Sequence, residues 1–411
     1  MKILVVTQYF WPEGFRINDL VTGLVDRGHE VTVLTGKPNY PSGKIFPEYL
    51  QDPSAFASYN GIPVVRIPML ARGARAITLL FNYTSFALCA SLIGAFKLRG
   101  RKFDAIFVYE PSPISVGFPA IALRWLKKAP VAFWVLDLWP ESLEATGAVR
   151  SKFVLRQVGK VVKFIYDRCD LILAQSRSFV PEIARFDQLP DKIAYFPSWA
   201  DKVDCNVEEE PASEIPADRE KFSIVFTGNI GEAQDFGAVL DAAEWLKHNK
   251  AVRWIIVGDG RMASWVRKEV ERRQLQDCVL LPGRFPLERM RSFYMHADAL
   301  LVSLKAEPIF SMTIPGKLQS YLAEGLPILA MLNGEGANVL TRARAGFASP
   351  AGNGAALAKS VLKMMSMSKH DRSQMGRNGL MLSEKDFNRD SRIDELSRLL
   401  EGLRFAQHNR Q

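Results

Sequence analysis

Short apolar runs rich in β-branched residues alternate with helix-periodic stretches along the chain. In the first half these runs cover residues 2–7, 30–35, 104–110, 129–137 and 169–176. Each of the later runs follows a stretch in which apolar residues recur every three or four positions. This alternation predicts parallel strands joined by helices, which together form a doubly wound α/β sheet.

The alternation breaks once and then resumes. Residues 204–221 (DCNVEEEPASEIPADREK) are acidic, contain proline and lack periodicity, so we interpret them as a linker. The sequence therefore predicts one domain over 1–203 and another over 222–387, with a helix near the end at 388–405. Ligands are expected at the carboxyl ends of the strands, in a cleft between two facing domains. The strands of the second domain are predicted at 222–228, 253–260, 278–283, 297–304 and 327–332.

One uncharged segment is long enough to span a bilayer. Ala76–Phe96 has 21 residues without a charge and basic residues on both sides. Polar side chains interrupt it at Asn82, Thr84, Ser85 and Ser91, and a span would divide the first domain. We favour a helix that packs partly on its own domain and partly in the membrane interface. A fully buried helix and a membrane span are the alternatives.

Residues 151–167 have a basic amphipathic pattern. Lys152, Arg156, Lys160 and Lys163 fall on a helical face different from the apolar one. A surface helix with a solvated basic face is one interpretation. Beside an apolar segment flanked by arginines, membrane association is the one we favour. The apolar face holds Val154, Leu155, Val158, Val161, Val162 and Ile165.

The amino-acid composition indicates the cellular compartment of the protein and the kind of partner that it binds. The 411 residues carry a net charge of +9, and residues 1–200 alone hold 24 basic against 16 acidic side chains. A basic half favours anionic partners, such as phosphates, nucleic acid or an acidic membrane surface. The N-terminus MKILVVTQYF reads as a strand and not as a signal peptide. The scattered cysteines indicate a reducing compartment, so we predict a cytosolic location. They are Cys89, Cys169, Cys205 and Cys278.

The second half contains the clearest phosphate-binding candidates. The turn Gly228–Gly231 (GNIG) follows a predicted strand and precedes a predicted helix, where backbone N–H groups can approach an anion. Gly258–Gly260 (GDG) is a similar turn, and for both a tight turn without a ligand is the alternative. Pro315 suits the first position of a helix that would place Lys317 in its first turn. The helix dipole opposes a cation there, so a bound phosphate would explain Lys317 better than solvent does.

The first half contains candidate acid–base groups. Glu110, Asp137 and Glu141 stand at or just after the ends of predicted strands, where carboxylates can act as general bases or hold a substrate hydroxyl. Helix capping is the competing role. Arg16, in the long aromatic loop Gln8–Asn18, is suited either to a diphosphate or to a structural ion pair.

Several motifs do not occur in the sequence. It has no GxxxxGK[ST] phosphate loop and no GxGxxG after the first strand, which disfavours the usual modes of nucleoside-triphosphate hydrolysis and of NAD binding. It also has no Asp-x-Asp pair that would hold a metal–diphosphate complex. We therefore expect a site without a metal.

Several motifs together resemble glycosyltransferase family 4. They are RGHEVTVLTG after an N-terminal YFWPE loop, DLWPES, FTGNIGEAQ, VGDG and IPGKLQSYLAEGLPI, and their order covers nearly the whole chain. More narrowly, the chain resembles the branch of L-fucosamine (N-acetyl-fucosaminyl) transferases that act in bacterial O-antigen and capsule synthesis.

The resemblance implies a GT-B fold of two facing Rossmann-like domains. The second domain would hold a nucleotide-sugar, the first domain the acceptor, and the last helix, about 388–411, would pack back on the first domain. Transfer would be independent of metal and would retain the anomeric configuration. The donor-binding residues implied are Gly228, Asn229, Gly231, Gln234, Arg284, Phe285, Thr313, Lys317 and Ser320.

The sequence departs from the wider family at two places. That family has two glutamates eight residues apart before Gly-x-Pro, and the matching positions here are Met312 and Ser320, with Glu307 nearby. The first-domain histidine of the family also has no counterpart. Asp137 stands about where it would be, and we expect Asp137 to contact the sugar hydroxyls.

The function expected is therefore transfer of a sugar from a UDP-sugar to a saccharide on a polyprenyl diphosphate. N-acetyl-L-fucosamine as the sugar rests on the resemblance alone. The enzyme would need no cofactor, bind no nucleic acid and lie on the cytoplasmic face of the inner membrane. A nucleotide-sugar epimerase of similar fold is the alternative, which the basic, apolar first half disfavours because an epimerase needs no acceptor surface.

Overall fold

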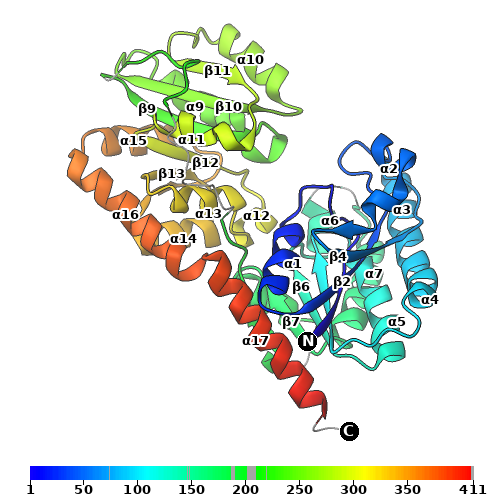
Figure 1. The fold of residues 1–411 in the computed structure, drawn as a ribbon. Coiled ribbons are helices and arrows are strands. Elements are labelled where there is room, and N and C mark those ends of the chain that lie inside the picture. Colours follow the sequence, from blue (N-terminus) through cyan, green and yellow to red (C-terminus); the bar gives the residue numbers. More distant parts are fainter. Residues whose placement is uncertain are drawn as a thin grey trace. The chain divides into compact units, whose positions relative to one another are not determined.

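The chain folds into two compact units, each built on its own parallel sheet. The computed structural model describes residues 1–73, 75–145, 147, 149–186, 190–200, 210–218 and 220–408. The first unit comprises Met1–Pro197 and Asp390–Gln411, and the second comprises Ser198–Arg389 (Figure 1). The first unit therefore ends a few residues earlier than the predicted boundary at 203. The predicted class, two Rossmann-like α/β domains, is confirmed.

The sheet of the first unit has the order β3-β4-β2-β1-β5-β6-β7-β8. Its pairs are parallel except for β3 with β4. Both faces are covered, so the central strands are almost entirely apolar and buried. The strand order reverses between β1 and β5, which places the binding crevice of such a sheet at their carboxyl ends. The strands are β1 (Lys2–Val6), β2 (Glu30–Gly36), β3 (Ser58–Tyr59), β4 (Ile62–Ile67), β5 (Ala105–Glu110), β6 (Val131–Val135), β7 (Leu171–Ala174) and β8 (Ile193–Tyr195).

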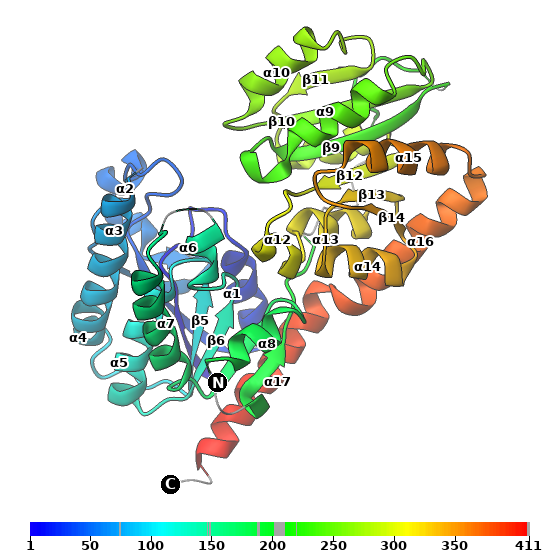
Figure 2. The same ribbon diagram turned by 180° about the vertical axis from the view of Figure 1, so that it is seen from behind.

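Helices cover both faces of this first sheet. In Figures 1 and 2, α3, α4, α5 and α7 lie on one side, and α1, α8 and α17 lie on the other. A π-helical turn, Ala90–Gly94, joins α3 to α4. The helices are α1 (Arg16–Asp26), α2 (Pro47–Gln51), α3 (Ala76–Cys89), α4 (Ala95–Lys97), α5 (Gly117–Lys127), α6 (Glu141–Ala145), α7 (Lys152–Tyr166), α8 (Phe179–Ala184) and α17 (Arg389–His408).

The last helix, α17, belongs to the first unit. Arg27, just after α1, pairs with Asp390 and Asp394 of α17. The imidazole Nε2 of His29 lies 2.6 Å from the hydroxyl of Ser397. These contacts, made near the start of β2, tie the end of the described chain to its beginning.

The apolar segment after residue 75 forms a helix that is only partly buried. Among the described residues, one helical stretch, Ile77–Lys97, has the length and composition of a membrane span, and only 28% of its apolar part is buried. Phe86 and Ala90 face the core, whereas Leu92 and Phe96 are 71% and 73% exposed. A fully buried helix is therefore wrong. On the apolar face of α7, Leu155, Val162 and Ile165 are buried, whereas Val154 is exposed.

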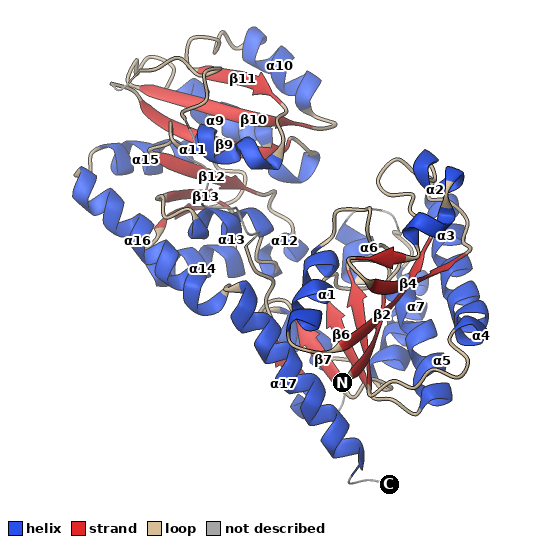
Figure 3. Ribbon diagram, in the orientation of Figure 1, coloured by secondary structure: helices blue, strands red, loops and turns tan. Residues whose placement is uncertain are grey.

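The second unit has a six-stranded sheet in the order β11-β10-β9-β12-β13-β14 (Figure 3). All of its described pairs are parallel, and the order reverses between β9 and β12. The strands are β9 (Phe222–Asn229), β10 (Val252–Asp259), β11 (Val279–Gly283), β12 (Ala299–Ser303), β13 (Ile328–Met331) and β14 (Gly346–Ser349).

Two apolar cores cover the two faces of this second sheet. One face packs on α9, α10 and α15, and the other on α11, α13 and α14. The helices are α9 (Phe236–Trp245), α10 (Ala263–Arg272), α11 (Met290–Tyr294), α12 (Pro308–Met312), α13 (Gly316–Ala323), α14 (Glu335–Ala343), α15 (Gly354–Met365) and α16 (Lys369–Asp386).

The predicted linker is in part an element of the second unit. Ala212 and Ile215 are buried in its core, and Glu214 forms a bidentate ion pair with Arg289. Apolar side chains and a pairing carboxylate thus fix residues 210–218, so the interpretation of this part as linker is wrong. The rest of the predicted linker, 204–209 with Cys205, lies outside the described residues.

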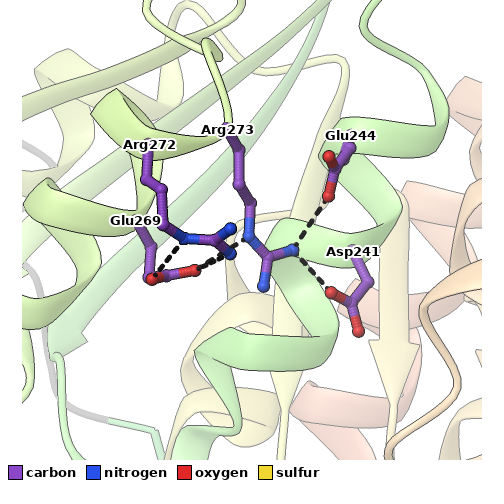
Figure 4. Close-up of polar contacts among 5 residues, drawn as sticks. All are labelled: Asp241, Glu244, Glu269, Arg272 and Arg273. Carbon is purple, nitrogen blue, oxygen red and sulfur yellow. Dashed lines mark hydrogen bonds and ion pairs between the residues drawn. The ribbon is translucent and has the colours of Figure 1, made fainter.

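A network of charges joins α9 and α10 at the surface. Arg273, which follows α10, bonds Asp241 and Glu244 of α9 and Glu269 of α10, while Arg272 bonds Glu269 from the other side (Figure 4). The hydrogen bonds from Arg272 and then Arg273 lower the pKa of Glu269 to about 2. All five side chains are engaged with one another, which makes this cluster structural.

Candidate active site

A pocket of about 410 Å³ opens at the carboxyl ends of β9, β10 and β11. It lies on one side of the point where the strand order of the second sheet reverses, the place where such sheets bind ligands. Four residues predicted for the donor therefore come together: Gly228, Asn229, Arg284 and Phe285. The full lining is Gly228, Asn229, Val257, Gly258, Asp259, Gly260, Arg284, Phe285 and Met290.

Glycine is required where β9 and β10 meet at this pocket. Gly228 and Gly258 face each other across the two strands and have φ angles of 121° and 152°, which other residues rarely adopt. A Cβ atom on Gly258 would lie 1.8 Å from the carbonyl oxygen of Gly228. The turns at Gly228–Gly231 and Gly258–Gly260, which were predicted separately, therefore lie side by side and line the same pocket.

The side chain of Gln234 closes the first of these turns. Its Oε1 accepts hydrogen bonds from the backbone N–H of Gly231, at 3.0 Å, and from the amide of Asn229, at 3.4 Å. The N–H of Gly231 is thus used inside the turn. Gln234 therefore stabilises the turn from Asn229 to Gly231. Gly228, at the start of the turn, lies against Lys317.

Lys317 stands at the start of α13 with its ammonium group against Gly228. A Cβ atom on Gly228 would lie 2.8 Å from Cε and 3.0 Å from Nζ of Lys317. The ammonium lies 5.2 Å from the ring centre of Phe226, and burial lowers the pKa of Lys317. Pro315 is the N-cap residue of α13, one position earlier than predicted. Among the described residues no hydrogen bond or ion pair satisfies this ammonium, which suits it to an anion beside Gly228.

Two tyrosines that the sequence did not point to, one on α13 and one on α11, bond Thr227 of β9. The hydroxyl of Tyr321 lies 2.8 Å from the backbone nitrogen of Thr227, which donates to it. The hydroxyl of Tyr294, on α11, lies 2.8 Å from Oγ1 of Thr227. Burial raises the pKa of Tyr321 to about 12, so it stays neutral. Tyr321 fixes the helix that carries Lys317.

The remaining residues predicted for the donor lie around this helix start. Thr313 donates its hydroxyl to the carbonyl of Ile309, at 2.9 Å, so it completes α12. Ser320 lies on α13 and is partly exposed, and a ribose contact there stays a prediction. Arg284 is exposed at the pocket, and the ring of Phe285 packs against Phe293 at 4.8 Å. A base contact at Arg284 and Phe285 also stays a prediction.

In the first unit, two of the three predicted carboxylates meet beside the reversal point of the sheet. Glu110 ends β5 and is fully buried. Its Oε2 accepts a 3.3 Å hydrogen bond from the backbone nitrogen of Asp137, which follows β6. The other oxygen, Oε1, is buried and has no hydrogen-bond partner among the residues that the structure describes. Burial first, and then the charge of Asp137, raises the pKa of Glu110 well above its usual range.

The carboxylate of Asp137 is oriented by hydrogen bonds from neighbouring side chains. It accepts hydrogen bonds from Nε1 of Trp139, at 3.1 Å, and from the hydroxyl of Ser142. Burial raises its pKa, and the bonds from Ser142, Trp139 and Ser112 lower it. Ser112 has a φ angle of 131°, a strained backbone that is often found at functional sites.

Glu141 differs from the other two carboxylates. It begins α6 and lies 3.7 Å from the guanidinium of Arg185. Burial raises the pKa of Glu141, and its Oε2 is buried without a hydrogen-bond partner in the described part of the chain. The pKa of the buried Tyr166 hydroxyl, which was not predicted, is raised well above its usual range, first by burial and then by the charges of Glu110, Cys169, Glu141 and Asp137.

Arg16 is the first residue of α1. It lies beside Tyr109, whose pKa is raised by burial and whose hydroxyl receives a hydrogen bond from the backbone of Arg16. Its predicted contact with a diphosphate stays a prediction.

Glu110 makes the stability of the first unit dependent on pH. The folded state keeps this proton after the unfolded chain, with its ordinary pKa near 4.5, has lost it. Stability is therefore expected to fall as pH rises above that value, by about 1.4 kcal/mol per pH unit, until the raised pKa is passed. Glu110→Gln should remove this slope in urea unfolding of the first unit. Glu144→Gln, at an exposed position, should keep it, and an unchanged slope in Glu110→Gln would contradict the assignment.

Within the part of the chain that the structure describes, no three His, Cys, Asp or Glu side chains gather in an arrangement suited to a metal ion.

Comparison with known families gives the class of the protein. Residues 14–199 match the glycosyl transferase 4-like domain, and residues 221–367 match the glycosyl transferases group 1 domain. Together with the two sheets, these matches define the chain as a glycosyltransferase of the GT-B fold. Its halves are a glycosyltransferase-4-like domain followed by a group 1 domain.

Individual relatives agree with this class. The probable glycosyltransferase WbjE of Pseudomonas aeruginosa is 25% identical over 277 residues, which cover 64% of this chain and 66% of WbjE, just under two thirds. WcaI of Escherichia coli K12, whose name assigns it to colanic acid biosynthesis, is 24% identical over 343 residues, or 79% of this chain and 82% of WcaI.

Solved structures share the fold. HepE of Anabaena, crystallised with UDP and glucose, superposes with a TM-score of 0.66 at 14% identity, over 98% of this chain and 99% of HepE.

Proposed function

We propose that this enzyme transfers a sugar from a UDP-sugar to a lipid-linked saccharide in the synthesis of a bacterial surface polysaccharide. The observation that carries the proposal is the ammonium of Lys317, which no described residue pairs, beside Gly228 at the edge of a pocket lined by glycine turns. The name of WcaI supports the pathway class, and the UDP and glucose bound to HepE support the donor class.

In this proposal the diphosphate of the donor lies beside Gly228, against the ammonium of Lys317. When the bond from the anomeric carbon to the diphosphate breaks, its electron pair leaves with the diphosphate, and Lys317 stabilises the added charge. A protein cation at this position takes the part that a divalent metal would otherwise play, so we propose that transfer needs no metal. The uridine would reach towards Arg284 and Phe285.

The acceptor hydroxyl is proposed to bind at Asp137. Glu110, kept protonated by burial, leaves Asp137 as the ionised member of the pair, able to hold or deprotonate a hydroxyl. The hydroxyl attacks from the face that the diphosphate leaves, so the configuration is retained. N-acetyl-L-fucosamine is the sugar proposed, on the resemblance of the sequence.

One helical face of the first unit is proposed to dock on the cytoplasmic leaflet of the membrane. Exposed apolar side chains gather on α3, α4, α5 and α7, which lie on one side of the sheet (Figure 1). Three basic side chains of α7, Lys152, Arg156 and Lys160, are exposed beside them and complement anionic lipids. The apolar side chains include Leu80, Phe81, Leu92, Phe96, Trp125 and Phe153.

Thermal unfolding with a panel of nucleotides tests the proposal. UDP at about 100 times its dissociation constant is expected to stabilise the protein by about 2.7 kcal/mol, equally with magnesium and with EDTA. GDP, dTDP and CMP should give smaller shifts. A shift that needs magnesium would contradict the metal-free site, and no shift with any nucleotide would contradict the donor class.

A further inference from the structure

Arg72 is a half-buried cation without an acidic partner. It lies in the segment between β4 and α3, where its guanidinium lies 3.3 Å from the hydroxyl of Tyr9 and 5.2 Å from the ring centre of Tyr40. Its backbone nitrogen donates to Oδ1 of Asn39, at 3.0 Å. No carboxylate pairs with Arg72 among the residues that the structure describes. Its neighbours are hydroxyl groups and rings, which fix the guanidinium and leave its charge uncompensated.

The helix that follows Arg72 joins an apolar surface to the polar end of the sheet. On its inner side, Asn82 is fully buried, accepts a 2.8 Å hydrogen bond from Gln8 just after β1, and donates to the carbonyl of Leu70 at 2.6 Å. On its outer side, Leu80 and Phe81 are each 53% exposed. Helix α3 is thus fastened at the reversal point of the sheet with apolar side chains left uncovered.

Tyr83 connects Arg72 to the candidate carboxylate. Burial raises the pKa of Tyr83, the charge of Arg72 and a hydrogen bond with Ser112 lower it, and the charge of Asp137 raises it. Its ring packs edge-on against Trp139, at 6.4 Å, and Trp139 in turn donates to Asp137. Tyr83 therefore lies near both Arg72 and Asp137 in the first unit.

We propose that Arg72 binds the diphosphate of a lipid-linked acceptor, with the lipid along the outer face of α3 and the sugar at Asp137. The inference rests on the function proposed above and assigns the residue that recognises its acceptor. An acceptor of this class has three parts in a fixed order: an apolar chain, a diphosphate and a sugar hydroxyl. The first unit presents, in the same order, an exposed apolar helix, an uncompensated guanidinium and a carboxylate. Arginine suits this position because its planar fork can bond two phosphate oxygens.

Flotation with vesicles tests this assignment. Neutral phosphatidylcholine vesicles would carry either a polyprenyl diphosphate or the corresponding polyprenol, so that the two differ only in the diphosphate. The wild-type protein should bind the diphosphate vesicles more tightly. Arg72→Gln should lower that affinity by about 10- to 100-fold, the factor expected for a lost charged hydrogen bond, and should leave binding to polyprenol vesicles unchanged.

Arg99→Gln is the matched control. Arg99 is exposed just beyond α4, at the other end of the same apolar stretch, so this variant removes an equal charge. It should keep the preference for diphosphate. If Arg72→Gln does not fold, Arg72→Lys replaces it in the test. Its affinity for the diphosphate vesicles should be lower than that of the wild-type protein and of Arg99→Gln, but higher than the affinity for polyprenol vesicles.

Two results would overturn the inference: no preference of the wild-type protein for the diphosphate vesicles, or equal losses in Arg72→Gln and Arg99→Gln. The nucleotide shift separates this failure from failure of the proposed function. If UDP still stabilises Arg72→Gln as it does the wild-type protein, the transferase stands and only the role of Arg72 falls.

Discussion

Lys317→Ala is expected to lower the rate of sugar transfer by about 100-fold or more, the usual cost of removing one group that stabilises charge in a transition state. The ammonium of Lys317 lies against Gly228 at the edge of the pocket and has no ion pair among the described residues. Its loss should leave the charge on the departing diphosphate unbalanced. Steady-state kinetics with a UDP-sugar would measure this as a lower kcat/KM.

The matched control for this variant is Lys268→Ala. Lys268 is exposed on α10 of the same unit and away from the pocket lining, so its removal should leave transfer unchanged. Comparable losses in both variants would indicate a general effect of charge. Full activity in Lys317→Ala would refute the role assigned to this lysine.

Asp137→Asn should lower kcat by about 10²- to 10⁴-fold, the range for removal of a group that accepts a proton or holds the reacting hydroxyl. The donor site lies in the other unit, so the stabilisation by UDP should be unaffected. Because burial raises the pKa of Asp137, the activity of the wild-type protein should fall as pH drops through that raised value, where the carboxylate gains a proton.

Glu144→Gln provides the comparison for Asp137. Glu144 is an exposed carboxylate on α6, next to the same loop, and its variant should keep both the rate and the pH profile. If Asp137→Asn retained its rate while losing stability, Asp137 would be a structural residue held by Trp139 and Ser142 and nothing more.

The sequence pattern predicted the central strands of both sheets and the edge strand β11, and it missed β3, β4, β8 and β14, which lie at or next to the other edges. β5 and β12 are apolar because both faces of the sheet are covered, so their runs stand out. β4 contains Pro63 and Arg66, and β14 has only four residues and begins with glycine. Arg66 is nevertheless buried, because carbonyl oxygens accept its hydrogen bonds. The local sequence pattern does not indicate that distant carbonyl oxygens will accept the hydrogen bonds of a buried arginine.

The candidate site was predictable where one short segment forms it. The turn at Gly228 and the helix start at Lys317 each carry a local signal, because glycine permits backbone angles that other residues rarely adopt and proline fixes φ. The anchoring of α13 by Tyr321 joins positions 94 residues apart. The same holds for Tyr166, whose pKa is affected by carboxylates that lie far from it in the sequence. Contacts between residues so far apart in the sequence can be identified only from the folded structure.

A crystal structure of the protein with UDP would test the central claim most directly. The account predicts phosphate oxygens at hydrogen-bonding distance, about 2.7–3.2 Å, from the ammonium of Lys317, with the diphosphate against Gly228 and the uracil towards Phe285. UDP bound at the carboxylates of the first unit, or in the second unit with its diphosphate away from Lys317, would contradict it.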